Sequence, residues 1–319
     1  MYCPRLPSRS EWAPIRHHRY HLRHWGTPQP DALPLLMLHG WMDVSASFQF
    51  VVDALVQPRH IIAPDWRGFG LTRPQNTDPH GPQPWGHGDH YLFADYLADL
   101  DFVLDHLNAQ LGRNADAPFD LVGHSMGGNV VMAYAGIRPQ RVRRAVNLEG
   151  FGLPATRPVQ APRQYTRWLD DLKTLHQGGK TLRPYPDADG VARRLMKTNP
   201  RLHPDRAAWL AQHWAAPDAS GQWHILGDPA HKTRSAHLYR ADETLALYQH
   251  ITAPVLAIEA DTDSLRHWYP HGEYTLADYH TRLHTVPNCR TAVVPDAGHM
   301  LHHDQPAAVA TLIEAHLQP

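Results

Sequence analysis

The sequence predicts an α/β fold, a doubly wound and mostly parallel sheet with an inserted helical segment. Three observations support this prediction. Short apolar runs alternate with helical patterns, which is typical of buried parallel strands joined by helices. The alternation stops in the middle of the chain and resumes near its end. At 319 residues, the chain is long enough for one large core that carries an insertion.

The first 150 residues contain the alternation in its clearest form. We expect strands at residues 20–25, 35–38, 61–63, 119–122 and 145–148, and helices at about 47–55, 91–107 and 127–135. The first strand alternates between apolar and polar residues, as an edge strand does, and the later strands are apolar throughout. These elements form the first part of the core, residues 1–150.

Residues 151–247 differ in character from the segments on either side. Prolines open this region and tryptophans recur within it: Pro154, Pro158, Pro162, Trp168, Trp209, Trp214 and Trp223. Helical patterns replace the buried strands, so we interpret this region as a helical cap. Strands resume at residues 254–258 and 291–294, and a helix follows at about 307–316. Residues 248–319 therefore form the second part of the core.

The composition excludes several classes of function. The 30 basic and 31 acidic residues nearly cancel, so the charge does not favour nucleic acid or an anionic membrane, and a small molecule is the expected partner. Cys3 and Cys289 are too few for a disulfide framework and are expected to be free thiols. The N-terminal residues lack the apolar run of a signal peptide or membrane span, which predicts a cytoplasmic protein.

Histidine is frequent, at 26 residues. Four of them, His17, His18, His21 and His24, lie in the expected edge hairpin without a neighbouring cluster of carboxylates or thiols. Because metal sites require closed sets of ligands, we interpret these histidines as surface residues and expect no metal site.

The segment Gly-His-Ser-Met-Gly, residues 123–127, stands directly between a buried strand and a helix. A sharp strand-to-helix turn forces its serine toward unfavourable backbone angles and requires small residues on both sides. The turn also places Ser125 at a helix N-terminus, where backbone N–H groups favour developing negative charge. We predict that Ser125 is a catalytic nucleophile.

A serine nucleophile needs a base and an acid that orients the base. His299 follows Gly298 in the loop after the last predicted strand and is the expected base, whereas His302 and His303 are expected to start the next helix. For the acid, the loop after residues 254–258 offers Glu259, Asp261 and Asp263. Asp263 lies furthest beyond the strand and is preferred.

Glu149 is the rival to Asp263, because it ends the strand that follows the nucleophile helix and could approach the same imidazole. Both choices preserve the chain order serine, acid, histidine. The oxyanion requires backbone donors, for which we expect the N–H groups of Trp41, after Gly40, and of Met126. Asp65 and Arg67, after another strand, are expected to brace loops through charge-assisted hydrogen bonds.

Four segments together resemble the signature blocks of the α/β-hydrolase superfamily, as found in a capped member. They are residues 38–41 (Leu-His-Gly-Trp), 63–70 (Ala-Pro-Asp-Trp-Arg-Gly-Phe-Gly), 123–128 (Gly-His-Ser-Met-Gly-Gly) and 297–299 (Ala-Gly-His). Residues 148–152 and 228–232 resemble a branch described as serine hydrolase-like. The resemblance implies an antiparallel first hairpin, no cofactor, and a pocket between sheet and cap. The usual Gly-x-x-Asp of the acid loop reads Ala-Asp-Thr-Asp here, at residues 260–263.

The expected activity is hydrolysis of small carboxylic esters through an acyl-enzyme on Ser125, His299 and Asp263. The aromatic cap suggests an apolar or aromatic substrate, although its tryptophans could equally form the core of the cap. The same residues could serve C–C bond hydrolysis, lactone opening, perhydrolysis or a lyase reaction. A serine nucleophile disfavours the aspartate-dependent haloalkane dehalogenases and epoxide hydrolases. A different class of function is a small-molecule receptor with little turnover.

Overall fold

The computed structural model describes residues 2–29, 32–78 and 84–318. In this part of the chain, most strands form one nine-stranded sheet and two others form a small hairpin. The sheet contains β1 (Arg9–Ile15), β2 (His18–Trp25), β3 (Leu35–Leu38), β4 (Ile61–Pro64), β5 (Arg73–Pro74), β6 (Phe119–His124), β7 (Val142–Leu148), β10 (Val255–Ala260) and β11 (Cys289–Val294). The hairpin contains β8 (Ala215–Pro217) and β9 (Trp223–Ile225).

The sheet is mostly parallel. Its strand order is β1-β2-β4-β3-β6-β7-β10-β11, with β5 paired to β2. All neighbours from β4 to β11 are parallel, whereas β1, β2 and β5 pair in the antiparallel sense. The chain leaves β3 toward one edge of the sheet, where β4 lies, and returns past β3 to β6 on its other side. This reversal of direction places the connecting helices on both faces of the sheet. The doubly wound, mostly parallel sheet with an antiparallel first hairpin is confirmed.

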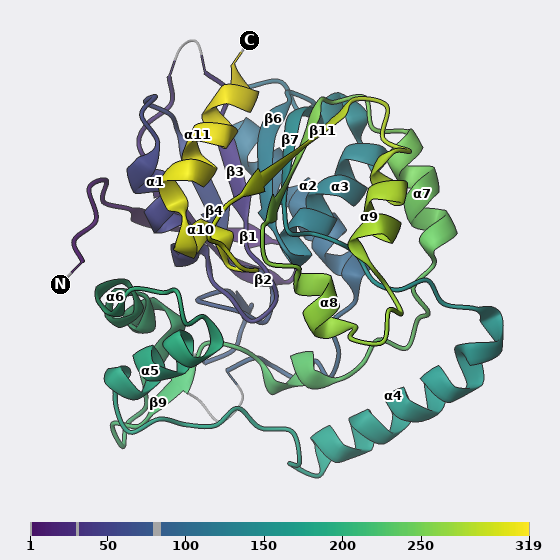
Figure 1. The fold of residues 1–319 in the computed structure, drawn as a ribbon. Helices are drawn as coiled ribbons and strands as arrows, with labels where there is room; N and C mark the ends of the chain where they lie inside the picture. Colours follow the sequence, from purple (N-terminus) through teal and green to yellow (C-terminus); the bar gives the residue numbers. More distant parts are fainter. Residues whose placement is uncertain (1, 30–31, 79–83, 319) are drawn as a thin grey trace.

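Helices cover both faces of the sheet (Figure 1). In the core they are α1 (Gln49–Ala54), α2 (Phe93–Gln110), α3 (Met126–Ile137), α8 (Ser264–Trp268), α9 (Leu276–Leu283), α10 (Leu301–Asp304) and α11 (Pro306–Leu317), with 3-10 turns η1 (Ser45–Phe48) and η2 (Pro139–Arg141). The apolar pattern predicted the long helices. It did not predict the short helices α8 and α9, which lie between β10 and β11.

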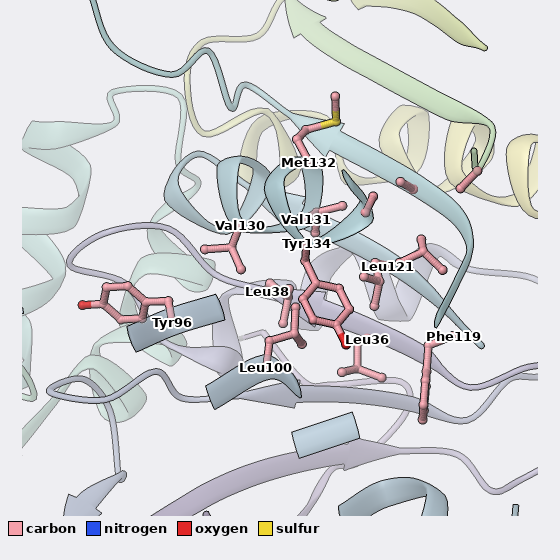
Figure 2. Packing of buried hydrophobic residues seen from close by; sticks show 14 of the residues in the cluster. Leu36, Leu38, Tyr96, Leu100, Phe119, Leu121, Val130, Val131, Met132 and Tyr134 are labelled. Atoms are coloured by element: carbon pink, nitrogen blue, oxygen red, sulfur yellow. The ribbon is translucent and has the colours of Figure 1, made fainter. Parts of the chain in front are cut away.

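Strand β3 shows why its run of apolar residues is needed. Leu36 and Leu38 pack in the cluster that contains α2 and α3, whereas Leu35 and Met37 pack in the cluster that contains α1 and α11. Figure 2 shows Leu36 and Leu38 in the first cluster, together with Tyr134 of α3. Successive side chains of a strand point to opposite faces, so a strand covered on both faces must be apolar at every position.

The region between β7 and β10 is mostly helical. It contains η3 (Pro158–Gln160), α4 (Ala161–His176), α5 (Ala188–Thr198), α6 (Pro204–Trp214), the β8–β9 hairpin, η4 (Pro229–Lys232) and α7 (Ala241–Gln249). Helix α4 has no buried side chain and extends away from the rest of the molecule (Figure 1). Helices α5 and α6 pack together, and their apolar cluster includes Val44 and Phe50 of the core.

Helix α7 packs against α3 of the core. A Cβ atom at Gly136 would lie 2.2 Å from the backbone oxygen of Leu247, so the two helices approach closely at a glycine. The boundary expected at residue 247 therefore falls within α7, a helix that contacts the core.

Among the described residues, no helix is both long and apolar enough to cross a membrane. The cytoplasmic location expected from the sequence stays a prediction. Cys3 and Cys289 are free thiols, as expected.

Candidate active site

Ser125 occupies the turn between β6 and α3. Its backbone angles are φ 53° and ψ −114°, outside the regions that L-residues prefer. The Ser125 N–H donates to the backbone oxygen of Leu148 at 2.8 Å, which ties the turn to the end of the neighbouring strand β7. Strain held in place by surrounding structure is typical of functional sites. The position predicted for Ser125, on a sharp strand-to-helix turn, is therefore the one observed.

Two glycines of the motif make this turn possible. A Cβ atom at Gly123 would lie 2.2 Å from the backbone oxygen of Gly127, and a Cβ atom at Gly127 would lie 2.0 Å from the backbone oxygen of Leu38. The obstacles are backbone atoms, which cannot move aside as a flexible side chain does. The spacing Gly-x-Ser-x-Gly thus reflects close packing of the turn against itself and against β3.

His299 lies against the serine. Its Nε2 atom is 3.0 Å from the Ser125 Oγ atom, a distance at which the hydroxyl donates to the ring. The histidine belongs to the loop between β11 and α10. His124, directly before the serine, donates from Nε2 to the backbone oxygen of His299 at 2.7 Å. The residue before the nucleophile therefore holds the backbone that carries the histidine, a role that the sequence pattern did not predict.

Glu149 is the carboxylate that contacts His299. Its Oε2 atom is 3.2 Å from the His299 Nδ1 atom. Ser264 Oγ donates to the same carboxylate oxygen at 2.7 Å, and the Ala260 N–H donates to Oε1 at 2.8 Å. The residue is 2% exposed and has a positive φ of 55°. Asn147 bonds both the N–H and the oxygen of Gly150, which braces the turn around Glu149.

The preference for Asp263 is corrected by this geometry. Asp263 is the N-cap of α8, and its Oδ1 atom accepts from the Arg266 N–H at 2.8 Å instead of facing the imidazole. An aspartate immediately before a helix satisfies a free N–H group of the first turn, and this local bond orients its side chain. The structure thus brings Ser125, His299 and Glu149 together, and it places Asp263 outside this set.

The other two acids of the same loop also have separate partners. Glu259 binds His280, and both of its carboxylate oxygens lie within 3.0 Å of the His280 Nε2 atom. Asp261 accepts from the backbone N–H groups of Asp296 and Ala297, at 2.8 and 3.1 Å, and so holds the loop that leads to His299. Both acids stabilise the surroundings of the site without contacting the imidazole.

Burial shifts the pKa values of the acid and the base in opposite directions. Burial raises the pKa of Glu149 to about 7, although the bonds from Ala260 and Ser264 oppose the shift. Burial lowers the pKa of His299 to about 4, with the negative charge of Asp43 acting in the other direction. Because burial disfavours every charged form, the low-dielectric surroundings strengthen the interaction between the two groups when both are charged.

The residues expected to bind the oxyanion flank the serine. Met126 is the first residue of α3, and Trp41 follows Gly40 in the loop after β3. A Cβ atom at Gly40 would lie 3.2 Å from the Ser125 Cβ atom, so this loop passes beside the nucleophile. Within the described residues, the backbone N–H groups of Trp41 and Met126 donate to no other group. Both are therefore available to an oxygen bound at the serine.

One tryptophan ring lies against His299, and a second tryptophan follows Gly40 beside the serine. Trp268 packs edge-on against the His299 ring at a centroid distance of 4.5 Å and is 43% exposed. Trp41 is 52% exposed. Three tryptophans of the region between β7 and β10, Trp209, Trp214 and Trp223, pack against the apolar cluster of α5 and α6. The sequence patterns did not indicate Trp268 or Ser264, because the short helix that carries them has no clear periodicity.

Asp65 and Arg67 brace loops, as expected, but with separate partners. Asp65 binds His21 Nδ1 at 2.8 Å and accepts from the Ser45 N–H at 2.7 Å. Arg67 binds the buried Asp99 through two nitrogens, at 2.5 and 2.6 Å. These bonds connect the loops after β3 and β4 to β2 and α2, and neither residue contacts Ser125 or His299.

Comparisons with known proteins agree with the fold. A family described as alpha/beta hydrolase fold matches residues 34–306. A serine hydrolase-like protein of Danio rerio is 26% identical over 290 residues, which are 90% of this chain and 82% of that protein. A 2-hydroxy-6-oxo-2,4-heptadienoate hydrolase of Pseudomonas putida is 36% identical over 123 residues, 38% of each chain. A solved thioesterase domain from the curacin biosynthetic pathway has a TM-score of 0.77 at 24% identity and covers 97% of this chain and 99% of that one, which shows the fold alone.

Proposed function

We propose that this chain, which belongs to the α/β-hydrolase fold family, is a serine hydrolase that cleaves small carboxylic esters. One observation carries the proposal: Ser125 Oγ, His299 and Glu149 form a continuous hydrogen-bonded relay at the end of the sheet. The fold alone would not support an activity, because many functions share it. The relay does, since it supplies a nucleophile, a base and an orienting acid in contact with one another.

The first step is attack on the ester carbonyl. His299 Nε2 accepts the Ser125 proton as Oγ bonds to the carbonyl carbon, and the imidazole becomes positively charged. Glu149 accepts the Nδ1–H of that ring, which fixes its tautomer and stabilises the imidazolium. Ser264 and the Ala260 N–H hold the carboxylate in place through their bonds to its two oxygens. In this reaction, Glu149 takes the acid role for which Asp263 was preferred on sequence.

The carbonyl oxygen becomes negatively charged in the same step. The N–H groups of Trp41 and Met126 are the proposed donors to this oxyanion, and one such donor typically contributes about 2.7 to 4 kcal/mol to the transition state. His299 then returns its proton to the departing alcohol, and the acyl group stays on Ser125. His299 then deprotonates a water, which attacks the acyl carbon; the bond to Ser125 Oγ breaks, His299 returns the proton to Oγ, and the acid leaves.

The surroundings of the serine favour an apolar or aromatic substrate. Trp268 presents exposed ring surface beside His299, and Trp41 next to Gly40 is also exposed; such rings contribute large apolar contact area. A second candidate is hydrolysis of a C–C bond in an oxo-acid, because a 2-hydroxy-6-oxo-2,4-heptadienoate hydrolase is 36% identical over part of the chain. The same nucleophile, base and oxyanion donors would serve both reactions.

The proposal is tested with the Ser125→Ala variant. The wild type is expected to hydrolyse short p-nitrophenyl esters and to react with a fluorophosphonate probe. The variant should lose about six orders of magnitude in kcat, as other serine hydrolases do without their nucleophile, and should take no label. Undiminished turnover in a folded Ser125→Ala variant would contradict the proposal. Tight binding of a small molecule by a wild type that turns over no ester or oxo-acid would favour the receptor alternative.

A further inference from the structure

Behind the nucleophile lies a second group of polar side chains, which the proposed reaction does not use. Asp43, His124 and His302 come from the loop after β3, the end of β6 and helix α10, and they are 3%, 2% and 0% exposed. One potential ligand atom of each lies within 4.8 Å of those of the other two. The Asp43 Oδ2 and His302 Nε2 atoms are 3.9 Å apart.

Each of the three residues has a buried polar atom without a hydrogen-bond partner in the described part of the chain. These atoms are Asp43 Oδ2, His124 Nδ1 and both ring nitrogens of His302, Nδ1 and Nε2. Buried polar atoms are almost always paired, so several together in one place indicate a ligand that pairs them. The carboxylate oxygen is an acceptor only, and a neutral imidazole offers a lone pair on one ring nitrogen.

The outer contacts orient two of the three groups. The other oxygen of Asp43 accepts from the Val44 N–H at 2.9 Å, from Trp214 Nε1 at 2.8 Å and from Ser47 Oγ. His124 donates its Nε2–H to the backbone oxygen of His299. A neutral His124 therefore carries its lone pair on Nδ1, the ring nitrogen that has no hydrogen-bond partner among the described residues. Metal-binding histidines are oriented in the same way, by a bond from the other ring nitrogen to a carbonyl or carboxylate.

We propose that Asp43, His124 and His302 bind one divalent transition-metal ion of the zinc class. Two imidazoles and one carboxylate are a ligand set that zinc accepts, with a fourth position for water. Ligands of a tetrahedral zinc ion lie about 3.4 Å apart, given bonds of about 2.1 Å. The observed separations are larger, so side-chain rotations must bring the three atoms together by roughly an ångström when the ion binds.

Binding at this site affects the catalytic residues through His124. This histidine directly precedes Ser125 and donates to the backbone of His299, and its ring centroid lies 4.8 Å from that of His299. Rotation of His124 toward the ion would shift the backbone of Ser125 and of His299 and so disturb the hydrogen bond between them. We therefore infer that the ion inhibits turnover, a consequence that rests on the proposed function, whereas the binding itself does not.

Metal binding is measured on the full chain with Co²⁺ and Zn²⁺ as probes. The Ser125→Ala variant, which needs no turnover, should bind one Co²⁺ with the visible absorption of a tetrahedral site, and Zn²⁺ should displace it. Zn²⁺ should also raise the melting temperature, because it binds only the folded protein. Adding His302→Gln or Asp43→Asn should weaken binding at least tenfold and remove the absorption.

His303→Gln is the matched control, since it removes a neighbouring buried histidine and leaves the same number of histidines on the surface. It should retain the Co²⁺ absorption. In the wild type, Zn²⁺ should lower ester turnover, and the inhibition should require tenfold more Zn²⁺ in His302→Gln. Equal Co²⁺ binding in His302→Gln and in its parent would overturn the proposal, as would equal losses in His302→Gln and His303→Gln. So would a Zn²⁺-soaked crystal with only a water at the site, about 2.8 Å from each atom.

Discussion

The loops after β7 and β10 each carry an acid that could orient His299, but only the acid after β7 contacts it. Each follows a buried parallel strand, and each carries an acid near the carboxyl end of the sheet. Glu149 is the first residue beyond β7 and contacts His299. Asp263 lies three residues beyond β10, directly before α8, and caps that helix. A carboxylate next to a helix N-terminus accepts a hydrogen bond from the first turn of that helix, whereas one in a turn without a helix is free to contact a residue of another loop.

The sharpest test of this comparison is the isosteric pair Glu149→Gln and Asp263→Asn. Glu149→Gln should lower kcat for ester hydrolysis by about 10³ to 10⁴, the size of effect seen when the acid of a serine triad becomes an amide. Asp263→Asn should change kcat less than twofold, because asparagine also caps helices. Steady-state rates on a p-nitrophenyl ester measure both. A larger loss in Asp263→Asn than in Glu149→Gln would reverse the assignment.

The pH dependence of turnover reports the ionisation of Glu149. Only the ionised carboxylate stabilises the imidazolium that forms on His299, and burial raises the pKa of Glu149 to about 7. Protonation therefore removes activity, so kcat/KM should fall about tenfold per pH unit below about pH 7. The pH profile of wild-type kcat/KM from pH 5 to 9 tests this. A profile that is flat down to pH 5 would show that Glu149 is not the titrating group.

Ser264→Ala removes one of the two donors that stabilise the ionised Glu149. The bond from Ser264 opposes the rise in the pKa of Glu149, so its loss should move the acidic limb of the profile to higher pH. A neutral-donor bond contributes about 1 kcal/mol, which predicts a shift of under one pH unit and about a threefold loss of turnover at pH 7. Ser264→Thr keeps the hydroxyl and should restore the profile. An unchanged limb in Ser264→Ala would mean that the bond does not bias ionisation.

The smallest effect is expected from Asp263→Ala, which removes the helix cap. The loss should cost about 1 kcal/mol in the free energy of unfolding, measured by urea denaturation. Turnover should change little, with any loss confined to KM because α8 carries Trp268 beside the imidazole. Asp263→Asn, which keeps the cap, should show wild-type stability. A loss of kcat by orders of magnitude in Asp263→Ala would assign this residue a role beyond capping.

The inserted region shows a second difference between pattern and structure. Its proline and tryptophan content indicated a change of architecture, and the described residues between β7 and β10 are mostly helical. The sequence did not indicate which aromatic groups would face the site. Trp209, Trp214 and Trp223 pack against the apolar cluster of α5 and α6, whereas the ring beside His299 belongs to Trp268 of α8. Side-chain exposure depends on packing between distant segments, which no local pattern encodes.

The sequence by itself determined the features that leave a local pattern in the chain. Strand β3 is apolar at every position because it is covered on both faces, and Ser125 sits on a turn whose backbone contacts exclude any Cβ at Gly123 and Gly127. Only the tertiary structure decided which acid meets His299. That choice depends on strand order, because β7, which ends before Glu149, lies between β6 and β10. It also depends on local hydrogen bonding, because Asp263 accepts from the Arg266 N–H and Glu149 does not cap a helix. The group formed by Asp43, His124 and His302 is of the same kind, because three distant segments meet only in the folded chain.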